Sequence, residues 1–164
     1  MIAMDSWLQN LTRASLVGSA LMAGSFFVFS VMVMPALQRL PPTDGLRAMQ
    51  EINRVVNDKP LFGGVFVVAG LLSFAVAAAT IWTWDQPGAA YRLAGGLANG
   101  VGSFVLTMAF HVPRNNTLDK IDPTAGDAAT KWSDFYDAWV PGNHVRGAFS
   151  AAAVILLMLA LTAD

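Results

Sequence analysis

The chain has 164 residues, a length typical of one domain, of which 55% are hydrophobic and only 13% charged. Soluble domains carry about a quarter charged residues, so this composition indicates that most of the chain lies in a lipid bilayer. The net charge is −1 and there is no cysteine, so neither nucleic-acid binding nor disulfides, thiolate nucleophiles or cysteine-ligated metal centres are expected.

Four runs almost free of charge are long enough to cross a hydrocarbon core about 30 Å thick, at roughly 1.5 Å of helix rise per residue. We predict membrane-spanning helices over residues 14–37, 61–84, 91–112 and 145–162. The first run is too long for a signal-peptide core and follows a head without net positive charge, so we expect a retained span and no cleaved leader. Pro35 should end this span, because a proline inside a helix removes a hydrogen bond.

The first long connection follows the first span. A proline-rich turn there is followed by apolar residues at helical spacing over 46–56, which predicts a short amphipathic helix lying at the membrane interface. Gln50 and Asn53 lie one turn apart on this helix. They belong either to a surface connector or to a site in which they orient a ligand.

The second long connection is rich in aromatic residues. Trp132, Phe135, Tyr136 and Trp139 occur at i, i+3, i+4 and i+7, so they form one stripe on an expected helix in this last loop. An aromatic belt at the membrane surface explains the stripe. The alternative is one wall of a pocket for a flat aromatic ligand, which ring stacking would bind.

Four spans place both termini on one side of the membrane and both long connections on the other. Short connections between successive spans favour an all-α, antiparallel four-helix bundle. Most of the ten lysines and arginines lie on the long-connection side, so the positive-inside rule predicts cytoplasmic long loops, in a bacterial inner membrane. Small residues repeat every fourth position, as in Ser15, Ser19 and Ala23, or Gly96 and Gly100; such faces allow close helix packing and are compatible with a homo-oligomer.

The two histidines lie near the long-connection side. His111 ends the third span and His144 begins the fourth, so antiparallel packing can place both imidazoles at a similar depth. Ionisable groups at membrane depth are functional candidates. Two histidines are few for zinc, but they could hold copper with Met108 or ligate a haem axially. The alternative is an interfacial histidine bonded to a carbonyl group.

The run Asn143-His144-Val145-Arg146 offers two different chemistries. On a regular helix, Asn143 and Arg146 share a face and His144 points nearly opposite to Arg146. If Arg146 faces the bundle, it can hold an anion because it stays charged. If His144 faces inward instead, it is the better general base. Both can contribute only if the helix start is irregular, which the preceding Pro-Gly pair allows.

These motifs together resemble a known family. The run His-Val-Pro-Arg-Asn-Asn-Thr-Leu-Asp from His111, the aromatic stripe, the Asn-His-Val-Arg run and the stretch from Met49 to Asn53 resemble the anthrone-oxygenase-like integral membrane proteins. Many bacterial members of that group are known as a domain of unknown function. The positions that match the pattern are Asn53, Pro113, Asn115, Leu118, Trp132, Trp139, Asn143, His144 and Arg146. His111 departs from it, since asparagine is common there, which weakens a two-histidine ligand model.

The resemblance implies an activity. Fungal relatives oxidise anthrones to anthraquinones without an established metal or flavin, so no cofactor is expected. The reaction needs a base, donors for an anionic oxygen and a dry aromatic pocket. The expected catalytic residues are His144, Arg146 and Asn115, and the expected substrate-binding residues are Trp132, Tyr136, Trp139, Asn143, Gln50 and Asn53. The alternatives are a metal- or haem-binding redox protein using His111 and His144, and a non-catalytic accessory bundle.

Overall fold

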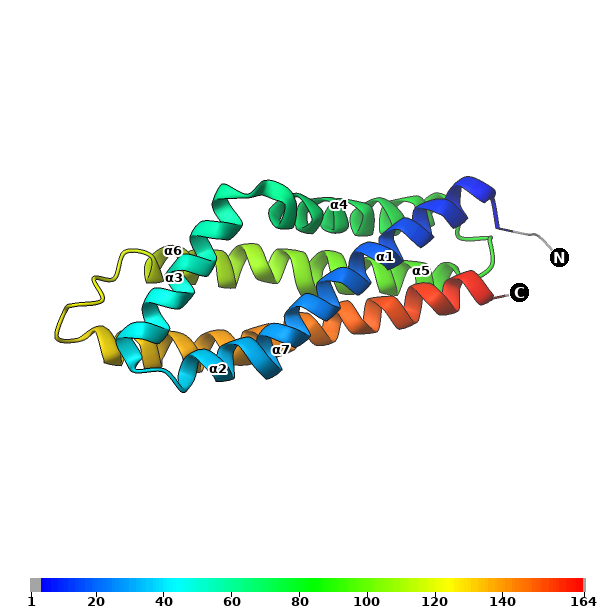
Figure 1. The fold of residues 1–164 in the computed structure, drawn as a ribbon. Helices are drawn as coiled ribbons and strands as arrows, with labels where there is room; N and C mark the ends of the chain where they lie inside the picture. Colours follow the sequence, from blue (N-terminus) through cyan, green and yellow to red (C-terminus); the bar gives the residue numbers. More distant parts are fainter. Residues whose placement is uncertain (1–3, 164) are drawn as a thin grey trace.

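Four long helical columns run side by side in the computed structural model, which describes residues 4–163 (Figure 1). In chain order the elements are α1 (Ser6–Val28), η1 (Phe29–Val33), α2 (Met34–Gln38), α3 (Pro42–Asp58), α4 (Pro60–Trp82), α5 (Ala89–Leu97), η2 (Ala98–Val105), η3 (Thr107–His111), α6 (Val112–Leu118) and α7 (Ala128–Thr162), where η denotes a π-helical turn. No strand occurs within this described range. The predicted all-α class is therefore confirmed.

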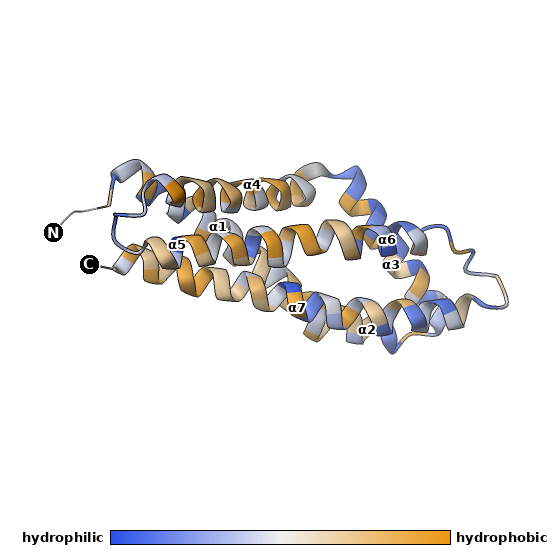
Figure 2. Cartoon of the chain, turned by 180° about the vertical axis from the view of Figure 1, so that it is seen from behind, coloured by the Kyte–Doolittle hydropathy of each residue, from blue (hydrophilic) through white to orange (hydrophobic). Residues whose placement is uncertain are grey.

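Each column is apolar and long enough to cross a membrane, which is consistent with an integral membrane protein. The four candidate spans are Ser6–Gln38, Leu61–Trp82, Ala89–Leu118 and Ala128–Thr162. α1 packs against α4 and α7, and α5 also packs against α4 and α7, so the columns close into one bundle. Both termini lie at one end, and α3 crosses the other (Figure 1). Hydrophilic residues gather at the α3 end, and the middle of the columns is mostly hydrophobic (Figure 2).

The prolines do not end the helices where local rules predict. The first column continues past Pro35 to Gln38, and the predicted aromatic helix joins the fourth span in one helix of 35 residues, α7, with Pro141 inside it. π-helical turns directly precede the α-helical segments that contain Pro35 and Pro113. A proline lacks an N–H and crowds the carbonyl four residues earlier, and a wider π turn accommodates both effects.

A polar network joins the columns within the apolar core. Asn99 donates from Nδ2 to Ser73 Oγ at 2.9 Å and accepts at Oδ1 from Ser150 Oγ at 3.0 Å. Ser15 Oγ lies 3.3 Å from the same Ser73 hydroxyl, and Ser150 Oγ lies 2.9 Å from Ser103 Oγ. A buried amide needs such partners in hydrocarbon, and serines of the neighbouring helices supply them to Asn99.

Gly96 lies where α5 meets α4 at close range. A Cβ there would be 2.7 Å from the Ser73 carbonyl oxygen and 3.0 Å from Ala77 Cβ. Because the carbonyl is backbone, Gly96→Ala should push the helices apart and lower the unfolding temperature in detergent. Gly24→Ala is the matched control, since nothing lies within 4 Å of its Cβ; it should be neutral or stabilising, because alanine favours helix by about 1 kcal/mol. Equal unfolding temperatures for the two variants would contradict this packing.

Candidate functional site

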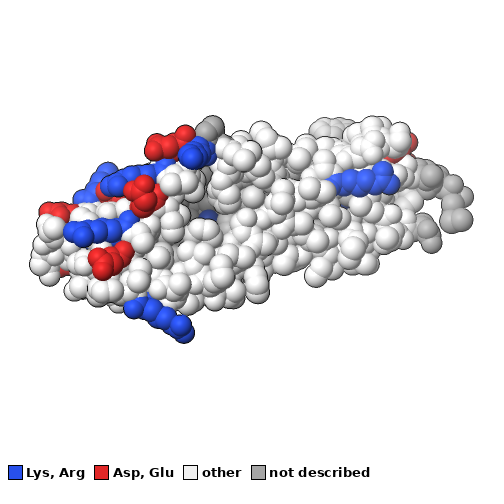
Figure 3. Space-filling model, viewed as in Figure 1, with Lys and Arg blue, Asp and Glu red and all other residues white. Residues whose placement is uncertain are grey.

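A cavity of about 240 Å³ lies between the ends of the columns and α3. Phenylalanine and aliphatic side chains form most of its wall. Its polar lining residues are Asn53, Asn57, Thr107, His111, Asn115, Asn116, Asp119 and Arg146. The molecular surface is hollowed beside α3, and a basic side chain is visible inside the hollow (Figure 3). Ligand pockets usually measure about 300–1,000 Å³, so this volume favours a compact ligand.

Arg146 is the buried cation of this cavity. Its Nε donates to Asn143 Oδ1 at 2.8 Å, and its Nη1 donates to Thr107 Oγ1 at 3.2 Å. The guanidinium carbon lies 4.1 Å from the centre of the Phe26 ring and 5.1 Å from that of Trp139. Within residues 4–163, Nη2 makes no hydrogen bond. Arg146 therefore has an unused donor in an aromatic environment.

No carboxylate of residues 4–163 forms an ion pair with Arg146. The ion pairs within the described part of the chain are Arg54–Glu51 and Lys131–Asp127, and both lie at the surface. A buried charge costs free energy unless it is paired, and Arg146 is only 7% exposed. Interactions with ring faces and neutral hydrogen-bond acceptors compensate part of this cost. An anionic ligand oxygen would complete the site.

Asn115 supplies a second donor to the same cavity. Trp139 donates from Nε1 to Asn115 Oδ1 at 2.9 Å, which ties α6 to α7 and fixes the orientation of the amide. The amide oxygen is thereby used, and the two N–H groups of Nδ2 make no hydrogen bond with any described residue. Arg146 and Asn115 thus each contribute a donor without a partner among residues 4–163 to the same cavity. The structure places three of the predicted site residues around one cavity: Arg146, Asn115 and Trp139.

Asn143 fixes the position of the Arg146 side chain through a hydrogen bond. Its Nδ2 donates to the Phe26 carbonyl at 2.7 Å and to Ser30 Oγ at 2.6 Å, while its Oδ1 accepts from Arg146. The Phe26 carbonyl lies just before the π-helical turn η1, where the α-helical bonding pattern is interrupted. Asn143 does not line the cavity. It was predicted to bind substrate, and the structure gives it a positioning contact instead.

The structure does not bring the two histidines into one cavity. His111 is buried, lines the Arg146 cavity and stands edge-on to Trp139, with ring centres 5.3 Å apart. Neither of its ring nitrogens has a hydrogen-bond partner among residues 4–163. His144 is exposed and lines a separate hollow of about 200 Å³ together with Ser30 and Asn143. Because α7 is a regular helix through these positions, Arg146 faces inward and His144 does not.

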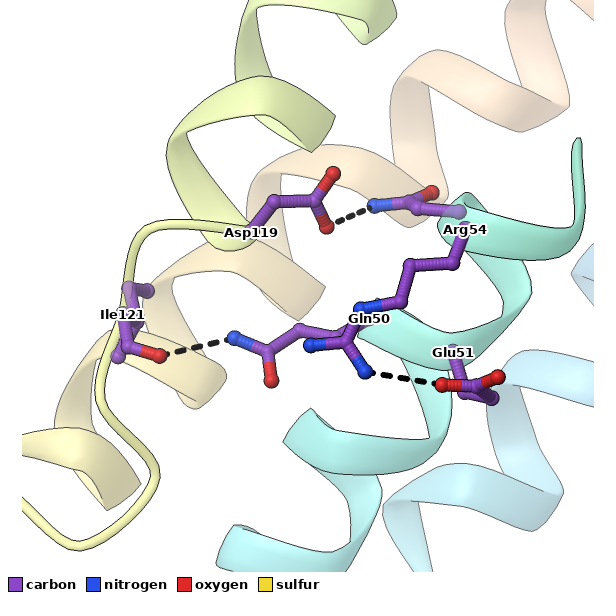
Figure 4. A network of polar contacts seen from close by, with 6 residues as sticks. Gln50, Glu51, Arg54, Asp119 and Ile121 are labelled. Atoms are coloured by element: carbon purple, nitrogen blue, oxygen red, sulfur yellow. Dashed lines mark hydrogen bonds and ion pairs between the residues drawn. The ribbon is translucent and has the colours of Figure 1, made fainter. Parts of the chain in front are cut away.

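The two predicted site residues of α3, Gln50 and Asn53, make different contacts. Gln50 donates from Nε2 to the carbonyl of Leu118, the last residue of α6, at 2.9 Å. The same nitrogen donates to the Ile121 carbonyl, also at 2.9 Å (Figure 4). Asn53 donates from Nδ2 to Asp119 Oδ1 at 2.8 Å and lines the cavity. Of the two predicted ligand contacts on this helix, only Asn53 reaches the cavity wall.

Only one residue of the aromatic stripe lines the cavity, and the others pack elsewhere. Trp139 lines the cavity, whereas Trp132 is buried against Phe135 with ring centres 5.9 Å apart. Tyr136 also packs beside this hydrophobic cluster and does not line the cavity. The four aromatic residues do lie on one helix, α7, as predicted, but α2 and α3 pack against the start of that helix.

Four polar cavity residues were not predicted as site residues from the sequence: Asn57, Thr107, Asn116 and Asp119. Thr107 lies one turn before His111, so helical spacing alone could have placed it on the same face. Asp119 lies one turn after Asn115, so helical spacing could have placed it on the cavity face as well, and its contact with Asn53 of α3 fixes it there.

The fold is an all-α bundle with four helices long and apolar enough to span a membrane. Within it, a buried arginine that has no carboxylate partner among residues 4–163 lines an aromatic cavity. The family model for anthrone oxygenase matches residues 53–156, so the chain belongs to the anthrone oxygenase family. The resemblance inferred from the motifs is confirmed. The matched segment includes every polar residue of the cavity. No curated protein and no solved structure matches the chain.

Proposed function

We propose that this protein is a membrane-embedded oxygenase that oxidises a hydrophobic phenolic compound of the anthrone type with dioxygen, without a resident metal or flavin. One observation carries the proposal. Arg146 is buried without a carboxylate partner among residues 4–163, and it lines an aromatic cavity together with Asn115, whose amide N–H groups have no acceptor in that part of the chain. Such a cavity suits a flat apolar ligand that carries one negatively charged oxygen.

The chemistry follows from the acidity of anthrones. Loss of a proton from the central ring carbon leaves an anion whose charge is shared with the ring oxygen. Arg146 and Asn115 stabilise that oxygen, and the carbon attacks dioxygen to form a peroxide that takes up one proton. The resulting hydroperoxide loses water, so one oxygen atom remains as the new carbonyl and the other leaves in water. No external reductant is needed, because the substrate supplies all the electrons.

The membrane arrangement supports a lipid-soluble substrate. The cavity lies at the end of the bundle where polar and apolar surfaces meet, and charged side chains gather at that end (Figure 3). We place this end on the cytoplasmic side of a bacterial inner membrane, following the positive-inside rule. A substrate dissolved in the bilayer then reaches the cavity without crossing the bundle.

The test is oxygen uptake by the purified protein in lipid nanodiscs with anthrone, beside protein-free nanodiscs that report spontaneous oxidation. We expect one anthraquinone formed for each dioxygen consumed. An absorption spectrum and metal analysis of the same sample address the redox alternative. A haem absorption band or stoichiometric copper would assign ligand roles to His111 and His144 and overturn the cofactor-free reaction. Oxygen uptake equal to the protein-free rate would overturn the oxygenase proposal.

A further inference from the structure

The Arg146 cavity contains a single carboxylate among the described residues. This is Asp119, which follows the last residue of α6. Asp119 also lines a shallow groove on the outer side, together with Glu51 and Arg54. Its carboxylate thus lies at the boundary between the cavity and the polar surface of the protein.

One oxygen of this carboxylate is held and the other is free. Oδ1 accepts a hydrogen bond from Asn53 at 2.8 Å (Figure 4), whereas Oδ2 accepts none from residues 4–163. No cation of the described chain pairs with Asp119, since the nearby Arg54 pairs with Glu51 at 3.0 Å. Arg146 lines the same cavity, yet the two groups form no ion pair within 4.0 Å. Among residues 4–163, a carboxylate and a guanidinium therefore line one cavity without forming a direct ion pair.

We infer that Asp119 is the proton acceptor for a carbon acid bound in this cavity, an inference that rests on the proposed function. The acidic C–H bond breaks, its electron pair moves into the ring system toward the oxygen held by Arg146, and the proton passes to Asp119 Oδ2. Asp119 then releases the proton through the outer groove. Aspartate can deprotonate a carbon acid when strong donors hold the developing anionic oxygen.

The contact with Asn53 gives the carboxylate its position. With Oδ1 held by an amide of α3, rotation of the carboxylate is restricted and Oδ2 remains available. Asn53 is thus a positioning residue in this inference. His144, predicted as the base from its chemistry, lies outside the cavity, whereas Asp119 lies within it.

Asp119→Asn removes proton acceptance but keeps the shape and an oxygen for Asn53. Under argon in D2O, the parent protein should catalyse deuterium exchange at the acidic carbon of anthrone above the protein-free rate, as followed by NMR. We expect Asp119→Asn to lower that exchange and the aerobic turnover by about 10²–10⁴-fold, the usual contribution of a general base. Asp119→Glu should retain part of both. Asp137→Asn, at an exposed position of α7 that lines neither the cavity nor the outer groove, should match the parent.

Two further measurements separate this role from a structural one. Binding of alizarin, a hydroxyanthraquinone whose anion is coloured, should be unchanged in Asp119→Asn. The deuterium isotope effect on turnover should rise in this variant, because C–H cleavage becomes limiting. Parent-like exchange by Asp119→Asn, or loss of alizarin binding together with loss of exchange, would overturn the role of Asp119. Deuterium exchange by the parent without oxygen uptake would support the role of Asp119 as proton acceptor and overturn the oxygenase proposal. Absence of exchange above the protein-free rate would overturn that role of Asp119.

Discussion

Arg146→Met is expected to lower anthrone oxidation by about 10²–10³-fold, the usual loss when a donor to a developing oxyanion is removed. The variant should nevertheless unfold within a few degrees of the parent. The guanidinium has no ion-pair partner among residues 4–163, so an apolar side chain of similar length avoids the cost of burying that charge, and this gain offsets the loss of the hydrogen bond to Asn143 Oδ1. The loss of activity should therefore far exceed any change in stability at this position.

Turnover, alizarin binding and thermal unfolding of the same preparations test this expectation. Arg146→Lys is the matched variant, because it keeps the positive charge and loses the planar fork of donors that reaches both Asn143 and Thr107. We expect its activity to lie between that of the parent and that of Arg146→Met. If Arg146→Met unfolds several degrees lower and loses activity only in proportion to the folded fraction, Arg146 is structural and the anion site is wrong.

Asn143→Leu should destabilise the bundle on the order of 3 kcal/mol, because each buried polar group left unpaired costs about 1–3 kcal/mol. Its amide serves the Phe26 carbonyl and the Ser30 hydroxyl on the first column and Arg146 on α7. Leucine has a similar size but satisfies none of these groups. Activity should fall as well, since Arg146 loses the acceptor that orients its Nε.

The adjacent substitution His144→Leu provides the control for Asn143→Leu. His144 is exposed and lies outside the Arg146 cavity, so its replacement should change stability by no more than about 0.5 kcal/mol. Denaturant titration of both variants in detergent, with oxygen uptake on the folded samples, measures the contrast. Loss of turnover in a stable His144→Leu protein would restore His144 as a base or metal ligand and contradict the assignment to Asp119.

Much of the architecture is determined by the sequence itself. Uncharged runs of spanning length, the apolar spacing over 46–56 and the aromatic spacing over 132–139 predict the four columns, α3 and the start of α7, because hydrophobic periodicity is a local property. The family is also readable, since its motifs lie in short stretches of the chain. Helical geometry further dictates that Arg146 and His144 cannot both face one cavity on a regular helix.

Which of the two faces inward was decided by tertiary structure. The inward turn of α7 follows from where α1, η3 and α6 pack, and those contacts join residues far apart in the chain, as in the bonds from Asn143 to Phe26 and from Trp139 to Asn115. The same packing keeps α7 helical through Pro141, although a proline inside a helix costs roughly 3 kcal/mol. Asn53 of α3 holds Asp119 at the cavity wall, and this bond joins residues 66 positions apart in the chain. Local rules act over one or two helical turns, whereas a cavity is defined by side chains from several helices at once.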